Sequence, residues 1–195
     1  DQIMAVCAEY LTAQGKLRSE GFVATVMSNL GLHKFCEENH LKLLCAAVGD
    51  RNVLELMQKE SMVLGGEQSG HIIFLEHMTT GDGQLAALQF LSILGQSGKK
   101  ASELAGQITH YPQLLQNVKV GSNEEKTAIL NSAELSMIVA REEERLTGHG
   151  RILLRASGTE PLIRVMAEAD TQDLAESVVK TLVQAVENIQ KILNK

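Results

Sequence analysis

Two glycine-containing segments of this 195-residue chain carry the residue types best suited to binding or chemistry. The first, residues 65–71, reads Gly-Gly-Glu-Gln-Ser-Gly-His. Its glycines allow the backbone to turn sharply and to approach a ligand closely. Its carboxylate accepts strong hydrogen bonds from paired hydroxyls, such as those of a sugar. The segment is therefore a candidate polyol-binding loop, and the alternative is a glycine-rich hairpin with solvated polar side chains.

The second segment, residues 151–164, reads Arg-Ile-Leu-Leu-Arg-Ala-Ser-Gly-Thr-Glu-Pro-Leu-Ile-Arg and predicts a strand that leads into a turn. Arg155, Ser157 and Thr159 stand at alternate positions, so their side chains point the same way if the strand continues into the turn. Gly158 frees the backbone, so that successive N–H groups can form an anion-binding nest. A guanidinium, two hydroxyls and several amides together predict a phosphate site.

Arg164, on the returning strand, would add a second positive charge to this phosphate site. The alternative is an ordinary hairpin turn whose arginines pair with Glu160 and Glu168. The residue types alone leave both interpretations open.

A weaker candidate is the pair Asp50 and Arg51, which follows the apolar residues 41–48. Ligands gather at the carboxyl ends of strands in open α/β sheets, so the pair would line such a crevice. Equally, the two side chains would pair with each other and cap the next helix. The sequence contains no D-x-D cluster of the type that holds Mg²⁺, no Walker A motif and no nucleophile elbow. We therefore predict no metal site within the chain and no obvious nucleophile.

Composition narrows the classes of partner. The chain has 18 basic and 24 acidic residues, a formal charge of -6 and only 3% aromatic residues, which argues against a nucleic-acid binder. It has no apolar run of about 18 residues and no signal-peptide pattern, so we expect a cytoplasmic protein without a membrane anchor. The cysteines Cys7, Cys36 and Cys45 are interpreted as buried free thiols in a reducing compartment.

The elements that position the two segments alternate between strands and helices up to about residue 110. This alternation predicts an α/β layer with a partly parallel sheet. Beyond that point the pattern becomes α+β, so we predict two domains, residues 1–110 and 111–195. The expected strands are residues 22–27, 41–48 (covered on both faces), 61–64, 71–76, 116–120, 151–156 and 162–169, and the long helices expected after the boundary are residues 124–146 and 173–193.

The two segments together resemble the α-D-phosphohexomutase superfamily, and the similarity runs through nearly the whole chain. Residues 65–71 are similar to that family's sugar-binding loop, and residues 155–166 to its C-terminal phosphate-binding loop. Residues 66–70 and 48–51 look most like the phosphoglucosamine mutase branch. The alternatives are the phosphomannomutase and phosphoglucomutase branches or, from another class, a non-catalytic phosphosugar-binding module.

The resemblance implies a four-domain enzyme of which this chain is the third, α/β domain and the fourth, small α+β domain of the TATA-binding-protein-like type. Such enzymes interconvert glucosamine 6-phosphate and glucosamine 1-phosphate, on the route to UDP-N-acetylglucosamine and the cell wall. A phosphoserine of the first domain and Mg²⁺ held by the second domain carry out the transfer, with a glucose or glucosamine 1,6-bisphosphate as activator or intermediate. Both catalytic loops would lie in N-terminal domains outside this chain, which would be inactive by itself.

The family's site residues map onto both segments. The residues that the resemblance implies for the sugar site are Asp50, Arg51, Glu67, Ser69, Gly70 and His71. Those expected to clamp the phosphate that is not reacting are Arg155, Ser157, Gly158, Thr159 and Arg164. Within the first set, His71 would lie near the reacting oxygen as a proton relay.

Overall fold

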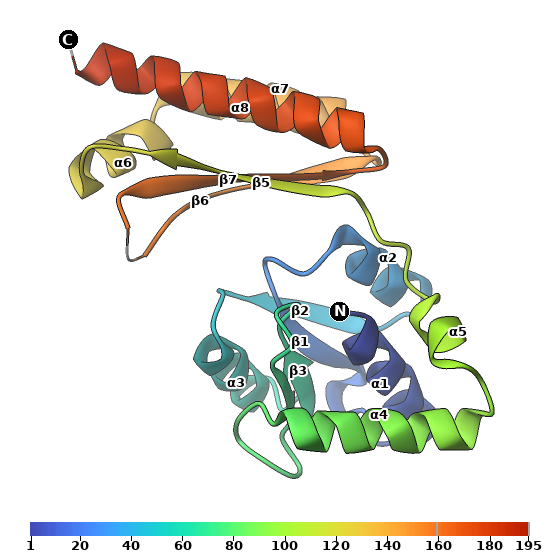
Figure 1. Cartoon of the computed structure of the whole chain (residues 1–195). Coiled ribbons are helices and arrows are strands. Elements are labelled where there is room, and N and C mark those ends of the chain that lie inside the picture. The colour runs from blue at the N-terminus through green and yellow to red at the C-terminus, as the bar shows by residue number, and fades with distance from the viewer. Residues whose placement is uncertain (159, 195) are drawn as a thin grey trace. The chain divides into compact units, whose positions relative to one another are not determined.

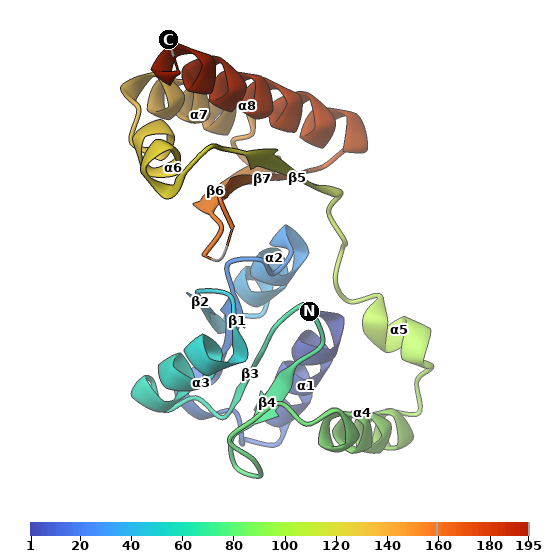
Figure 2. The same cartoon turned by 60° about the vertical axis from the view of Figure 1, so that its left-hand side comes forward.

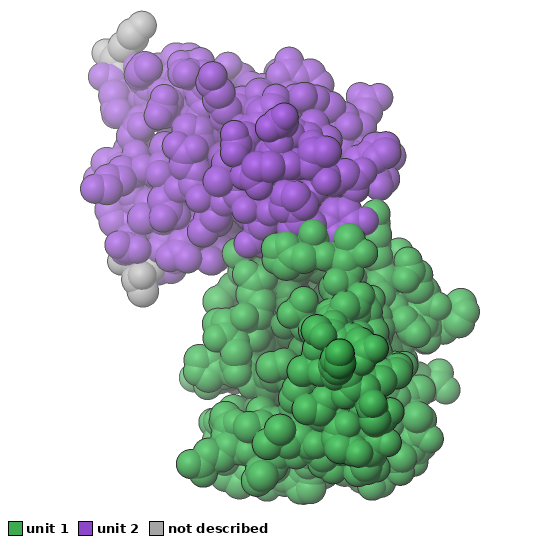
Figure 3. Space-filling model, turned by 45° about the vertical axis from the view of Figure 1, so that its right-hand side comes forward, with its two compact units in different colours: residues 1–110 green, residues 111–195 purple. Residues whose placement is uncertain are grey.

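The chain forms two compact units, Asp1–His110 (unit 1) and Tyr111–Lys195 (unit 2), in a computed structural model of the protein (Figure 3). The structure describes residues 1–158 and 160–194. Each unit has its own sheet and its own hydrophobic core.

Unit 1 is built on a four-stranded sheet with the strand order β2-β1-β3-β4 (Figures 1 and 2). β1 (Gly21–Thr25) runs parallel to β2 (Lys42–Ala46) and to β3 (Leu64–Gly66), whereas β4 (Ile72–Phe74) is antiparallel to β3. The mixed α/β sheet expected from the sequence is therefore confirmed. The helices of this unit are α1 (Gln2–Ala13), the short 3-10 helix Arg18–Glu20, α2 (Leu30–Glu38), α3 (Asp50–Lys59), α4 (Gly83–Ser97) and α5 (Ala101–Ala105).

Helices cover both faces of this sheet because successive strand side chains point to opposite sides. Phe22 and Ala24 of β1 join one core with buried residues of α1, α2, α4 and α5. Val23, between them, joins a second core with Val53 and Met57 of α3. β1 is buried along its whole length, as expected for a central parallel strand with helices on both faces.

β2 lies at the edge of the sheet and pairs with β1. The expectation that residues 41–48 form a strand covered on both faces is therefore wrong. Lys42 and Cys45 are exposed, and Leu43 and Leu44 are only half-buried. An apolar run does not distinguish a central strand from an edge strand, because strand order is decided by pairing with residues far away in the sequence.

The three cysteines differ in burial according to the element on which each lies. Cys7 and Cys36 are buried free thiols, as expected, and burial raises the pKa of each to about 12. Cys45 is exposed on the edge strand β2, so the expectation that all three are buried is wrong for this residue.

The end of α3 explains why β3 starts later than the sequence suggests. Ser61 follows the helix with a left-handed backbone (φ 57°), and the N–H of Met62 donates to the carbonyl of Met57 at 2.9 Å. This is the closing bond of a helix C-terminal motif in which one residue adopts the left-handed conformation. Residues that close a helix cannot also pair in a sheet, so the strand expected at 61–64 begins only at Leu64.

Unit 2 is a three-stranded antiparallel sheet in the order β5-β7-β6, with its described helices on one face (Figure 1). β7 (Leu162–Ala169) is central between β5 (Gln113–Lys119) and β6 (Gly150–Ala156). Alternate residues of β7, Ile163 and Val165 among them, enter the core with the helices. This is the α+β arrangement that the sequence predicted. The helices are α6 (Asn123–Leu130), α7 (Ala133–Arg145) and α8 (Gln172–Leu193).

The long helix expected at residues 124–146 is in fact two helices. α6 ends at Leu130 with Asn131 as its C-cap, and Ser132 is the N-cap of α7. Asn and Ser favour helix ends because their short polar side chains compete for backbone hydrogen bonds. The apolar spacing continues through the break, so it concealed the change of helix.

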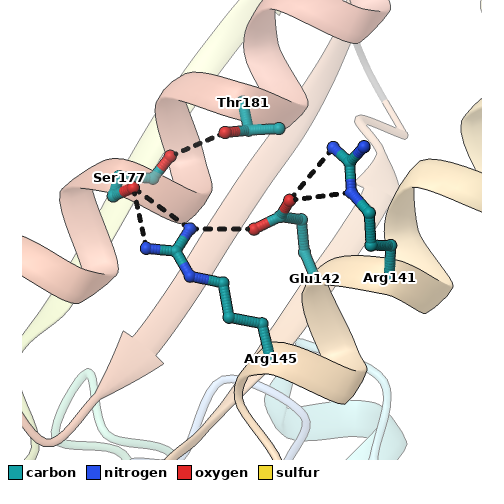
Figure 4. Close-up of polar contacts among 5 residues, drawn as sticks. All are labelled: Arg141, Glu142, Arg145, Ser177 and Thr181. Atoms are coloured by element: carbon teal, nitrogen blue, oxygen red, sulfur yellow. Dashed lines mark hydrogen bonds and ion pairs between the residues drawn. The ribbon is translucent and has the colours of Figure 1, made fainter.

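A buried carboxylate of α7 pairs with the arginine that joins α7 to α8 (Figure 4). Glu142 of α7 is only 4% exposed and lies between Arg141 and Arg145, with N–O distances of 3.2 Å to each. Arg145 also donates to the hydroxyl of Ser177 on α8 at 3.2 Å. The two helices are thus joined by polar contacts as well as by the core that they share.

Candidate functional site

The carboxyl ends of the three parallel strands lie at one edge of the unit 1 sheet, because parallel pairing aligns them. The buried polar residues of the described part of unit 1 gather in the strand ends and loops there: Thr25 at the end of β1, Ser28 and Asn29 after it, and Glu67 after β3. Ligands bind at this edge in open α/β sheets. The location is therefore a candidate binding site in its own right.

Glu67 is the centre of the carboxylate loop, by which we mean residues 65–71. Its side chain is 11% exposed, and Oε1 accepts a hydrogen bond from the backbone N–H of Gly49 at 2.7 Å. Gly49 has φ 123°, a conformation that residues with a Cβ rarely adopt. The carboxylate therefore ties the loop after β2 to the loop after β3, and a charged acceptor makes this bond strong.

Ser69 and His71 surround the second oxygen of the same carboxylate. The Ser69 hydroxyl lies 3.5 Å from Glu67 Oε2, and His71 Nδ1 lies 3.7 Å from that oxygen and 3.4 Å from the Ser69 hydroxyl. Gly70, with φ 107°, donates its N–H to the carbonyl of Glu67 at 3.0 Å and closes the turn. The His71 side chain is 62% exposed, so it is accessible to a ligand while it remains beside a carboxylate.

Asp50 and Arg51 do not pair through their side chains. α3 starts at Asp50, whose Oδ1 accepts the backbone N–H of Arg51 at 2.8 Å. The Arg51 guanidinium turns along the helix and contacts Glu55 at 2.9 Å. Asp50 directly follows Gly49, which bonds Glu67, so it adjoins the carboxylate loop, whereas Arg51 is engaged by Glu55.

In unit 2, Arg155 of β6 and Arg164 of β7 stand directly opposite each other in the sheet. They lie on the face away from the helices, because their neighbours Leu154, Ile163 and Val165 pack toward the helices. Like charges in this position destabilise a sheet. Burial, and then the neighbouring Arg164 charge, lower the pKa of Arg155 from its usual value.

The hydrogen-bonding groups of both arginines are only partly paired within the described residues. The Nε atoms of Arg155 and Arg164 are both buried without a hydrogen-bond partner there. The nearest carboxylate contact of Arg164 is Glu160, at 4.0 Å, whereas Glu168 pairs with Arg151. Both glutamates of the hairpin alternative therefore do contact an arginine of the segment, but Arg155 has no carboxylate contact within the described residues. An anion would supply a partner for it.

Internal hydrogen bonds join the residues after β6 to the start of β7 in this arginine bend, by which we mean residues 155–164. Ser157 is buried, its N–H donates to the carbonyl of Leu162 at 2.9 Å, and its hydroxyl accepts the N–H of Glu160 at 3.3 Å. Gly158 is exposed at the tip. Thr159, the other hydroxyl expected here, lies outside the described residues.

Sequence reasoning missed two contributors. One is the N–H of Gly49, which receives the Glu67 carboxylate. The other is Lys126 of α6, whose ammonium group donates to carbonyls of the arginine bend. A lysine three residues before the buried Ile129 was the available signal, because residues spaced by three share a helix face.

The described residues contain no cluster of three or more His, Cys, Asp or Glu side chains that would hold a metal ion. Nor is any helix in the described ranges long and apolar enough to span a membrane.

Comparison with protein families decides the classification. Residues 1–111 match the model described as "Phosphoglucomutase/phosphomannomutase, alpha/beta/alpha domain III", and residues 115–185 match the model of the C-terminal domain of the same family. The chain belongs to the phosphoglucomutase/phosphomannomutase family. Among these phosphohexomutases, the carboxylate loop falls within the domain III match and the arginine bend within the C-terminal match.

Among the curated relatives are bacterial proteins named phosphoglucosamine mutase. The chain is 48% identical to the protein of Ligilactobacillus salivarius over 187 residues, and 51% identical to that of Anoxybacillus flavithermus over 186 residues. These matches cover 96% and 95% of the chain, but only 41% of each relative. The chain therefore corresponds to less than half the length of these phosphohexomutases.

Solved phosphohexomutase structures share the fold. The N-acetylphosphoglucosamine mutase of Aspergillus fumigatus matches with a TM-score of 0.79 and 19% identity, over 97% of this chain and 43% of that one. A second N-acetylglucosamine-phosphate mutase, in a substrate complex, matches with a TM-score of 0.75 and 22% identity, over 95% of this chain and 43% of that one. At these identities the likeness shows the fold alone.

Proposed function

We propose that the chain is the substrate-binding half of a phosphoglucosamine mutase, which interconverts glucosamine 6-phosphate and glucosamine 1-phosphate in the cytoplasm. The identity of 48–51% to proteins of that name supports this branch over the phosphomannomutase and phosphoglucomutase branches. The observation that carries the binding role is the arginine bend. Arg155 and Arg164 face each other with both Nε atoms buried and unpartnered within the described residues, which is an incomplete site for an anion.

In this proposal, unit 2 holds the phosphate group that is not reacting. Arg155 and Arg164 supply two guanidinium groups, which match phosphate oxygens geometrically, and the tip of the bend supplies a backbone amide at Gly158. Thr159 and Ser157 are the proposed hydroxyl donors. A substrate that must react at either end needs recognition by groups common to both orientations, and a phosphate meets that requirement.

Unit 1 recognises the sugar hydroxyls. The Glu67 carboxylate is held in place by the Gly49 amide, and its Oε2 faces Ser69 and His71. Oxygen acceptors fixed before the ligand arrives lower the cost of orienting it. His71 stands exposed beside this carboxylate and is the proposed proton relay, with Asp50 nearby at the start of α3.

The phosphoryl transfer itself is proposed to depend on a phosphoserine and Mg²⁺ in domains that precede this chain in the whole enzyme. Mg²⁺ would supply charge neutralisation at the transferring group. The residues described here would position the substrate, and a bisphosphorylated hexose would bind them during the reaction.

Two measurements on the 195-residue chain test the proposal. Titration with glucose 1,6-bisphosphate should shift the amide NMR signals of Gly158 and of residues 67–71, and an assay for mutase turnover with Mg²⁺ should show none. Turnover close to that of a full-length relative would overturn the assignment as a binding half. An absence of shifts in both segments would overturn the binding role.

A further inference from the structure

Lys126 is a buried cation whose ammonium group contacts the backbone of the arginine bend. It lies on α6 and is 8% exposed. Its Nζ donates to the carbonyl oxygen of Ser157 at 2.7 Å and to that of Glu160 at 3.3 Å. One ammonium group thus contacts the carbonyl groups of both Ser157 and Glu160.

The contact with Ser157 fixes the direction of the next amide. In a trans peptide, the carbonyl of one residue and the N–H of the next lie in one plane and point in opposite directions. The N–H of Gly158 therefore points away from Lys126. Because α6 packs on the helix-covered face through Ile129, this direction leads away from that face and toward the side that carries the arginine pair.

The charge of Lys126 is not balanced by an acid. Both acceptors are neutral carbonyl groups, and no carboxylate pairs with Lys126 in the described part of the chain. A buried charge without a counter-ion is costly, and it attracts an anion that binds close by. Lys126 therefore both orients the Gly158 amide and contributes a positive charge near the arginine pair.

We infer that Lys126 is a positioning residue of the phosphate site, which aims the Gly158 amide at the bound anion by holding the carbonyls of Ser157 and Glu160. This inference rests on the proposed phosphate-binding function and adds a residue outside the bend to it. Lys126 itself does not contact the ligand. The class of ligand remains a phosphomonoester.

The test uses the whole 195-residue chain, with inorganic phosphate and glucose 1,6-bisphosphate as probes. Lys126→Met removes the donors and the charge but keeps a flexible side chain of similar length. Lys180→Met, at an exposed position of α8, removes one positive charge elsewhere and is the matched control. Affinities come from NMR titration, and the order of the Gly158 amide from ¹⁵N relaxation before any ligand is added.

The wild-type chain should show a Gly158 order parameter near that of rigid backbone, about 0.85, despite its exposed position. Lys126→Met should lower it toward about 0.6 and weaken binding of both probes about tenfold, the effect of losing one charge-assisted contact, while Lys180→Met changes neither. Wild-type affinity in Lys126→Met would overturn the inference.

A second result would overturn it without any variant. If Gly158 is already flexible in the wild-type chain, Lys126 does not position it, even should Lys126→Met fail to fold. The failure of the proposed function looks different. In that case the wild-type chain itself binds neither probe at the bend, and Arg155→Ala changes nothing.

Discussion

The carboxylate loop of unit 1 and the arginine bend of unit 2 differ in how far their charged groups are hydrogen-bonded within the protein. The Glu67 carboxylate is bonded to the Gly49 amide across two loops and is part of what holds the fold together. The guanidinium groups of Arg155 and Arg164 face each other with buried Nε atoms that lack partners within the described residues. The carboxylate is hydrogen-bonded within the protein, whereas the arginine pair would be completed by an anion in the proposed function. A substitution in the carboxylate loop should therefore lower the stability of unit 1, whereas a substitution in the arginine bend should weaken ligand binding.

The largest effect is expected at the arginine bend. Arg155→Ala should weaken binding of glucose 1,6-bisphosphate by about 1.5–3 kcal/mol, the range for a hydrogen bond to a charged group, or roughly 10- to 150-fold. Calorimetric titration would measure the loss. Arg141→Ala, which removes an exposed arginine on α7, is the control and should leave affinity unchanged. Equal affinity of the Arg155 variant and the wild-type chain would remove this residue from the site.

A smaller effect of a different kind is expected at the carboxylate loop. Glu67→Gln replaces a charged acceptor of the Gly49 N–H with a neutral one, so it should lower the free energy of unfolding of unit 1 by about 1 kcal/mol. Hydrogen exchange of the β1 and β3 amides would report unit 1 separately from unit 2. Glu55→Gln, at an exposed ion pair, should cost much less. If Glu67→Gln is as stable as that control, the link between the loops contributes nothing to the fold.

The smallest expected effect is a gain in stability rather than a loss. Arg155→Met should raise the free energy of unfolding of unit 2 by about 0.2–1 kcal/mol, because it removes a like charge directly across the sheet from Arg164. The gain would appear in a thermal melt without ligand and disappear when phosphate is added, since phosphate stabilises only the wild-type pair. A variant less stable than wild type without ligand would show that the opposed arginines carry no electrostatic penalty.

The sequence predicted what depends on nearby residues. The glycines in residues 65–71 indicated a sharp turn with polar side chains, and the structure has that turn, with Gly70 in the left-handed region. The alternation of strands and helices predicted the mixed sheet of unit 1, and the pattern after residue 110 predicted the α+β unit 2. Asp82, a residue type that favours helix N-caps, accepts the N–H groups of Gln84 and Leu85 at the start of α4.

The sequence did not predict features that depend on pairing. Apolar residues at 41–48 did not reveal an edge strand, and continuous apolar spacing hid the break at Asn131. The sequence analysis also did not identify Glu55 as the side-chain partner of Arg51. The two residues pair because they lie one helical turn apart on the same face of α3.

By itself, the sequence determined the chemistry of the two candidate segments, because a glycine turn with a carboxylate or an arginine within it needs only adjacent residues. The tertiary structure alone decided how each charge is balanced. It placed Glu67 against the amide of Gly49, Arg155 opposite Arg164, and Lys126 beneath Ser157. These partners are 9 to 31 residues apart in the chain, and only sheet register and helix packing bring them together.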